Sequence, residues 1–120
     1  MICVSIADVS VNEATQIINE NELSEVRMDR LNACMDDIKS LFSLKGKTIA
    51  TYRPVDGLDE ETRKKALILA IESGASYVDV EVEAADDFKA DIIAAARRKN
   101  CSVIVSYHDF TKTPVMRELE

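Results

Sequence analysis

The stretch SYVDVEV, residues 76–82, decides the fold because its two faces differ in polarity. Its three valines alternate with Asp79 and Glu81, and successive side chains of a β-strand point to opposite faces of a sheet. One face is therefore apolar and suited to packing against helices, whereas the other face carries two acids. A parallel strand that is covered on both faces is usually apolar throughout. The stretch predicts a strand with one buried face and one polar face.

Four other segments have strand-like composition, and segments with helical periodicity separate them. The strand-like segments are 2–6, 23–29, 47–53 and 101–107, and the helical segments are 11–21, 32–44, 59–74 and 86–100. Strict alternation of strands and helices is typical of parallel strands joined by right-handed crossovers. The residues after Pro114 are predicted to begin one more helix.

The third helical segment has the clearest pattern. Two charge pairs are expected four residues apart on its exposed side, Glu60 with Lys64 and Glu61 with Lys65. Gly74 is expected to end the helix. The apolar stripe consists of Ala66, Leu67, Ala70 and Ile71. The pattern predicts an amphipathic helix that packs on the sheet with one side.

The same change in polarity occurs at the carboxyl end of every predicted strand. One face of each strand is apolar, and the other becomes polar towards the strand end; the polar residues are Ser5, Glu25, Arg27, Thr51, Arg53, Asp79, Glu81, Ser106 and His108. In a closed barrel of parallel strands the outer face packs on helices, and active sites lie at the carboxyl ends of the strands. The sequence therefore predicts an α/β fold with a parallel (β/α) barrel of the TIM type.

Two rival folds of similar size match less well. A receiver domain needs paired acids after its first strand, an aspartate at the end of the third and a lysine after the fifth. Here Asp8 stands alone, the third strand ends in Arg53 and the fifth ends in His108. A nucleotide-binding Rossmann half needs a glycine-rich first turn, and SIADVSVNE, residues 5–13, contains no glycine.

The charge and cysteine content narrow the class of protein. The chain has 120 residues, with 15 basic and 22 acidic side chains and a net charge of −7, which disfavours binding to nucleic acid or to an anionic membrane. The three cysteines form no CxxC motif, so we expect reduced thiols that act as small core residues in a cytoplasmic protein. With a single histidine, no metal site and no cofactor are expected.

That histidine, His108, lies in VIVSYHDF, residues 103–110. One interpretation is structural: the ring ends a buried strand and finds local hydrogen-bond partners. The other is chemical, because an imidazole with a reference pKa of about 6.5 can take up and return a proton near neutral pH. The histidine alone does not decide between them.

Five segments together resemble type I 3-dehydroquinate dehydratase, a shikimate-pathway lyase with a (β/α)8 barrel. They are VSI (4–6), SEVRMD (24–29), TYRP (51–54), SGASYVDVEVEAADDF (73–88) and VIVSYHDFTKTP (103–114). Their order and spacing extend the resemblance over the whole chain. It implies that residues 1–120 form a single domain, the first five βα units of an incomplete barrel.

The resemblance also implies roles for individual residues. The family converts 3-dehydroquinate to 3-dehydroshikimate, a step of aromatic amino acid biosynthesis, through an imine between a lysine and the C3 ketone. His108 matches the general acid/base of the family. The residues that match substrate-binding positions are Ser5, Glu25, Arg27 and Arg53. The small-molecule partner would be 3-dehydroquinate, and a homo-oligomer, a dimer, is expected to form through the edge strands 2–6 or 101–107.

Asp79 and Glu81 have two open interpretations. They would orient or tune His108 as neighbouring carboxylates, or they would form ion pairs with Arg27 or Arg53 inside the barrel mouth.

The sequence departs from the family in two places. The loop PVDGLDEE, residues 54–61, replaces a Glu-Gly-Gly type of loop; Asp56 is the candidate for the missing glutamate, and its role is left unassigned. The family's imine lysine lies on the sixth strand, which the repeat spacing places at roughly residue 128 or beyond. Lys112 is the only lysine expected near the mouth. We therefore expect a truncated, inactive chain, with a non-catalytic half-barrel that binds a ligand or a partner as the alternative.

Overall fold

The strands and helices alternate along the chain as the sequence predicts. The computed structural model describes residues 2–55, 57–106 and 116–119. The strands are β1 (Cys3–Ile6), β2 (Leu23–Arg27), β3 (Lys47–Thr51), β4 (Tyr77–Glu81), β5 (Ser102–Ser106) and β6 (Met116–Leu119). The helices are α1 (Val11–Glu20), α2 (Met35–Phe42), α3 (Glu60–Ser73) and α4 (Asp86–Arg98), with a 3₁₀ turn η1 (Met28–Arg30) after β2.

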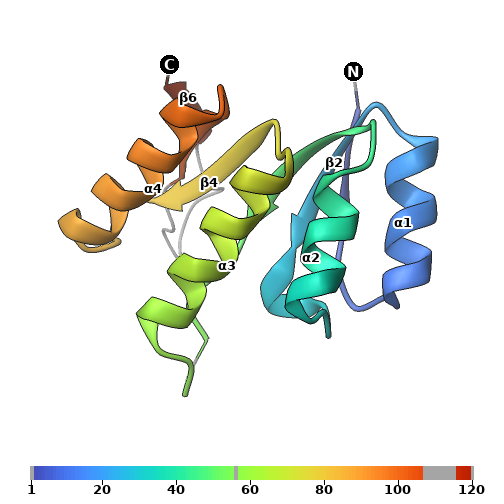
Figure 1. Ribbon diagram of the computed structural model, residues 1–120, viewed down its shortest axis with the longest axis horizontal. Coiled ribbons are helices and arrows are strands. Elements are labelled where there is room, and N and C mark those ends of the chain that lie inside the picture. Colours follow the sequence, from blue (N-terminus) through green and yellow to red (C-terminus); the bar gives the residue numbers. More distant parts are fainter. Residues whose placement is uncertain (1, 56, 107–115, 120) are drawn as a thin grey trace.

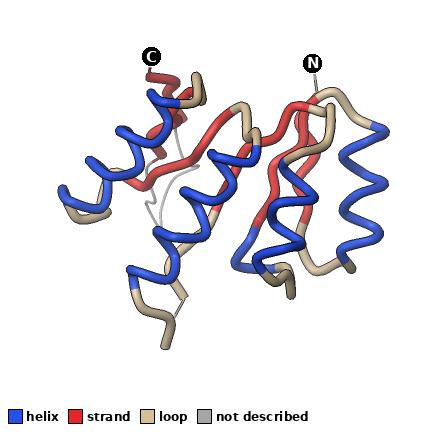
Figure 2. Tube along the Cα trace, viewed as in Figure 1, coloured by secondary structure: helices blue, strands red, loops and turns tan. Residues whose placement is uncertain are grey.

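The strands form one sheet in the order β1-β2-β3-β4-β5-β6, and the first five are parallel. The four α-helices lie side by side across one face of this sheet (Figure 1). The tube view shows the same two layers, with the helices in blue and the strands in red (Figure 2). A parallel sheet with its helices on one side is the wall of a (β/α) barrel, so the incomplete barrel is confirmed.

The hydrophobic core fills the space between the sheet and the helices. Each strand directs alternate side chains towards the helices, and the apolar ones among them form the core. Ile6, Val26 and Val78 are examples, and all three are at most 1% exposed. The stripe predicted on α3 is buried in the same layer. Because the helices cover these side chains, the remaining side chains of each strand point to the concave side of the sheet.

Local signals fix where the helices begin and end. Ser10 and Glu13 form a capping box at the start of α1, and the Asp59 carboxylate accepts a hydrogen bond from the Thr62 amide at 2.7 Å at the start of α3. Gly74 ends α3 with a φ of 129°, as predicted. A Cβ at Gly74 would lie 2.7 Å from the Phe42 carbonyl oxygen, so both the backbone angle and the space require glycine.

Two local predictions are wrong. Residues Met116–Leu119, expected to begin a helix, form β6, which pairs antiparallel with β5. The outer edge of β5 would otherwise present unpaired amides and carbonyls, and pairing with β6 satisfies them. The β5 edge is therefore covered, and β1 is the strand at the other edge of the sheet. On α3 the ion pairs form three residues apart, because Glu60 binds Arg63 and Glu61 binds Lys64.

The sheet loosens at one point. β2–β3 and β4–β5 are each paired over five residues, whereas β3 and β4 pair only through Ile49 with Tyr77 and Ala50 with Val78. Beyond these pairs the carboxyl ends of β3 and β4 have no ladder hydrogen bonds to each other. The two strands therefore separate at the edge of the sheet where the active sites of barrels lie.

The expectation that all cysteines are small core residues is wrong for two of the three. Cys101 is buried, but Cys3 and Cys34 are exposed, and all three thiols are free. Cys3 is exposed because it lies on the edge strand β1, in register with Leu23 on the concave side. Burial raises the pKa of the Cys101 thiol to about 11.

Alkylation distinguishes these thiols. We expect iodoacetamide at pH 8 to modify Cys3 and Cys34 in the folded chain and to spare Cys101, because the thiolate is the reactive form and Cys101 is only 7% exposed. Intact mass after brief labelling should show two adducts, with a third added in urea. Labelling of Cys101 in the folded chain as fast as Cys34 would contradict the packing.

Candidate functional site

The strand register brings the predicted polar residues to one edge of the concave face. Ser5 is in register with Glu25, and Arg27 is in register with Thr51. Farther along the sheet, Glu81 of β4 is in register with Ser106 of β5. All of these side chains point to the face of the sheet that the helices leave uncovered. The carboxyl ends of the parallel strands therefore carry polar side chains on the same face of the sheet.

Glu25 is held by hydroxyl groups from both neighbouring strands. The Ser5 Oγ donates a hydrogen bond to Oε1 at 3.2 Å, and the Thr51 Oγ1 donates to Oε2 at 3.0 Å. Each carboxylate oxygen is thus fixed by one hydroxyl, which sets the direction of the side chain. A carboxylate has about four lone-pair sites, so further hydrogen bonds can be accepted from a ligand.

Arg27 is paired with Asp29 in the turn that follows β2. Its Nε and Nη2 donate to the two Asp29 oxygens at 3.2 and 2.8 Å. The hydrogen bond that Arg27 donates to Asp29 raises the pKa of Arg27, and the nearby Glu25 charge adds to the effect. This fork uses two of the five guanidinium N–H groups in the described contacts, so Arg27 is positioned and still has donors for a second anion.

Asp79 is a buried acid on the same face. It is 3% exposed, and its Oδ1 has no hydrogen-bond partner among the described residues. Burial raises the pKa of Asp79, and the charges of Glu81 and Glu25 add to this. A hydrogen bond with Ser106 and the charge of Arg53 act in the opposite direction. Asp79 is therefore a carboxyl group whose charged form the site disfavours.

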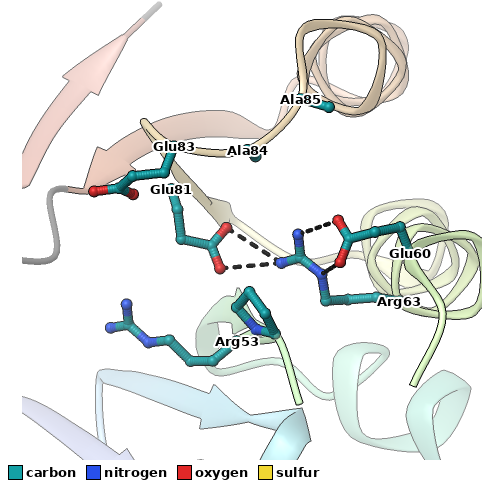
Figure 3. Close-up of a pocket in the computed structure, with 8 residues that line it drawn as sticks. Arg53, Glu60, Arg63, Glu81, Glu83, Ala84 and Ala85 are labelled. Carbon is teal, nitrogen blue, oxygen red and sulfur yellow. Dashed lines mark hydrogen bonds and ion pairs between the residues drawn. The ribbon is translucent and has the colours of Figure 1, made fainter. Parts of the chain in front are cut away.

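Glu81 has a partner that the sequence interpretation did not find. It binds neither Arg27 nor Arg53; its two oxygens accept hydrogen bonds from Nη1 of Arg63 at 3.0 and 3.2 Å. Arg63 comes from the first turn of α3 and also binds Glu60, as Figure 3 shows. Of the two open interpretations, the ion pair of Glu81 with Arg27 or Arg53 is not observed, because α3 supplies the guanidinium that binds Glu81.

A sequence signal for Arg63 does exist. Arg63 precedes Ala66 and Leu67 by three and four residues, so it occupies the apolar stripe of α3. A charged residue on a buried stripe needs a buried partner of opposite charge, and Glu81 at the end of β4 is the matching acid. The adjacent Lys64 and Lys65 obscure this signal, because three consecutive basic residues are typical of a solvated helix surface.

A pocket of about 560 Å³ opens beside these residues, where β3 and β4 separate. Its walls include Arg53, Arg63, Glu81 and Glu83, together with Pro54 and Ala84 from the loops. Three of the predicted residues, His108, Asp56 and Lys112, lie outside the described residues. In the described part of the chain, no group of three His, Cys, Asp or Glu side chains is arranged to hold a metal ion.

The comparisons with known proteins identify the family of the chain. Residues 2–120 match the family described as type I 3-dehydroquinase. The chain belongs to this family.

None of the helices in the described ranges is long and apolar enough to cross a membrane.

Several curated relatives of the family are similar to the chain. The 3-dehydroquinate dehydratase of Methanococcus maripaludis strain C5 is 30% identical over 99% of this chain and 58% of its own length. The bifunctional chloroplastic 3-dehydroquinate dehydratase/shikimate dehydrogenase of Arabidopsis thaliana is 35% identical over 82% of this chain and 18% of its own length. The chain thus spans little more than half the length of the single-function relative.

A solved structure shares the fold. The 3-dehydroquinate dehydratase of Enterococcus faecalis superposes with a TM-score of 0.77 and 20% sequence identity, covering 93% of this chain and 55% of the other. The superposition supports the partial barrel.

The raised pKa of Asp79 predicts how the free energy of unfolding depends on pH. A carboxyl group whose pKa is higher in the folded state than in the unfolded chain binds protons more tightly when folded, so the free energy of unfolding falls as pH rises through the folded pKa. The Asp79→Asn variant removes this loss. It should be more stable than the parent at pH 7, because the neutral amide does not bear the cost of a buried charge.

The gap should narrow as pH falls towards 4, which urea unfolding between pH 4 and pH 7.5 can measure. Asp91→Asn is the matched control, because Asp91 is an exposed acid paired with Lys64 on the helical surface. It should follow the pH dependence of the parent. Parallel curves for Asp79→Asn and the parent would show that Asp79 carries no such penalty.

Proposed function

We propose that the chain binds 3-dehydroquinate at the concave edge and contributes the acid/base and substrate-binding side of a site that dehydrates it. The observation that carries the proposal is the clustering of the matched residues. Ser5 lies on β1, Glu25 and Arg27 lie on β2, and Arg53 follows β3 by two residues, so all four are near the carboxyl ends of three neighbouring strands. Membership of the type I 3-dehydroquinase family supports the choice of substrate.

The side chains suit the chemistry of this ligand. 3-Dehydroquinate carries a carboxylate, hydroxyl groups and a ketone. Arginine offers a planar fork of N–H donors that matches a carboxylate, and Arg27 and Arg53 supply two such groups. Glu25, fixed by Ser5 and Thr51, can accept hydrogen bonds from hydroxyl groups of the ligand. The proposed roles are therefore anion binding for the arginines and hydroxyl binding for Glu25.

The proton-transfer role is assigned to His108 from its place in the sequence. His108 follows the end of β5 by two residues, and Ser106 at that end is in register with Glu81. By the family resemblance, the imidazole removes the proton next to the imine carbon and returns a proton to the departing hydroxyl. Asp79 and Glu81 are proposed to act on the charge of this region through space, Glu81 in its pair with Arg63.

The placement of the lysines supports a second candidate function, a binding module without imine chemistry. Lysines of the described residues lie on helices, as Lys64 and Lys89 do in ion pairs, or towards the amino ends of strands, as Lys47 does. In the described part of the chain, no lysine follows the carboxyl end of a strand on the concave face. Binding and catalysis are therefore tested separately.

Binding can be measured with quinate, a stable hydroxylated carboxylate. We expect saturable shifts of the amide signals of residues 25–27 and 51–53 in a nitrogen–proton NMR titration. Arg53→Met should weaken binding roughly ten- to a hundredfold, since a hydrogen bond to a charged group contributes about 1.5–3 kcal/mol. Arg97→Met is the matched control, because Arg97 is exposed on α4. Unchanged affinity in Arg53→Met would rule out Arg53 as the anion-binding group.

Imine formation can be measured with 3-dehydroquinate and sodium borohydride. Reduction of an imine leaves a covalent adduct, so intact mass reports it directly. We expect the mass of this chain to remain unchanged, because the described lysines lie away from the concave edge. An adduct that disappears in Lys112→Met would instead assign the imine to Lys112 and favour catalysis over the binding module.

A further inference from the structure

Arg63 spans the opening between β3 and β4. The ladder between these strands ends at Ala50 and Val78, and no ladder hydrogen bonds join their carboxyl ends. The Arg63 Nη1 donates to the Tyr52 carbonyl oxygen at 2.7 Å, just after β3, and to the Glu81 carboxylate at 3.0 Å at the end of β4. A side chain from α3 thus makes the link that the two strands lack.

The guanidinium is fixed on all sides. It is buried at 1% exposure, and its Nε and Nη2 donate to the Glu60 carboxylate at 3.2 and 2.8 Å. The Arg63 Cζ lies 4.2 Å from the centre of the Phe88 ring, within the range of a cation–π contact. Planar and always charged, an arginine can satisfy all these partners at once, which lysine cannot.

Arg53 and Glu81 line the same pocket as Arg63. In Figure 3 the Arg53 side chain extends away from Arg63, on the other side of Glu81. The pocket walls hold two guanidinium groups and three carboxylates, those of Glu60, Glu81 and Glu83. If Arg63 were removed, Arg53 would be the remaining cation beside these acids, and buried Glu81 would need a new partner.

We propose that Arg63 is a positioning residue for Arg53. By holding Glu81 and the carbonyl of Tyr52, the neighbour of Arg53 in the chain, Arg63 prevents a Glu81–Arg53 ion pair and keeps the Arg53 guanidinium directed at the concave edge. Arg63 therefore acts on the anion site from behind the sheet, without touching the ligand. The identity of the ligand rests on the proposed function, whereas the effect of Arg63 on Arg53 does not.

The experiment compares Arg63→Met, Glu81→Gln and the double variant, with Arg97→Met as control. The first readout needs no ligand: the NMR signal of the Arg53 Nε–H group, assigned through its loss in Arg53→Lys. We expect this signal to shift in Arg63→Met, because Glu81 then pairs with Arg53. Adding Glu81→Gln should return the signal towards its original position, since the neutral amide no longer attracts Arg53.

Quinate affinity is the second readout. Arg63→Met should bind quinate about tenfold more weakly, the effect of occupying one charged hydrogen-bonding group, and the double variant should regain most of this loss. A merely structural role would instead lower the free energy of unfolding of Arg63→Met and leave the Arg53 signal and the quinate affinity of the folded protein unchanged. If the parent fails to bind quinate but the Arg53 signal still shifts and returns, the proposed function is wrong and the positioning role stands.

Arg63→Lys covers the case in which Arg63→Met does not fold, as judged by circular dichroism and thermal unfolding. Lysine keeps the charge but cannot hold Glu60, Glu81 and the Tyr52 carbonyl together, so an intermediate shift of the Arg53 signal is expected. An Arg53 signal that is the same in the parent and in the folded Arg63 variants would overturn the proposal. So would a shift in Arg63→Met that Glu81→Gln fails to reverse.

Discussion

The structure depends on the packing of four helices against a single face of a parallel sheet. Residues such as Val26, Val78 and Leu67 are removed from water there, and apolar burial of this kind is the main favourable contribution to folding. Because side chains alternate along each strand, this packing also determines what the opposite face presents. The polar edge is therefore a direct consequence of core formation. A substitution that shifted the register of one strand by one residue would bury its acids and expose its valines.

Charge on the concave edge is balanced from both sides of the sheet. Glu25 and Asp79 lie on the concave face, with arginines from β2 and from the residues after β3 close by. Glu81 is neutralised by a helix residue at the point where β3 and β4 separate. Separating the strands costs ladder hydrogen bonds, and Arg63 replaces part of that loss with charge-assisted bonds. The weakest point of the sheet thus becomes an electrostatic connection between the outer and inner layers.

Much of this arrangement was predictable from local sequence. The alternation of Asp79 and Glu81 with valines gave the concave face, and Gly74 marked the end of α3. Features that depend on distant partners were not predictable in the same way. The exposure of Cys3 follows from the position of β1 at the sheet edge, and the strand state of Met116–Leu119 follows from the open side of β5. Arg63 was missed because its partner lies eighteen residues away and on another element. The roles of His108 and Asp56 stay predictions, since both lie outside the described residues.

The antiparallel direction of β6 has a consequence for growth of the sheet. β6 pairs with β5 from Val103–Leu119 to Ser106–Met116, on the side where a barrel would place its next parallel strand. A parallel strand can join there only by displacing β6, so extension at this edge is an exchange of one strand for another. The outcome of such an exchange depends on the local concentration of the incoming strand and on the stability of the four β5–β6 register pairs. While β6 is paired, the β5 edge is closed to strands of other chains, so β6 protects this edge from intermolecular pairing.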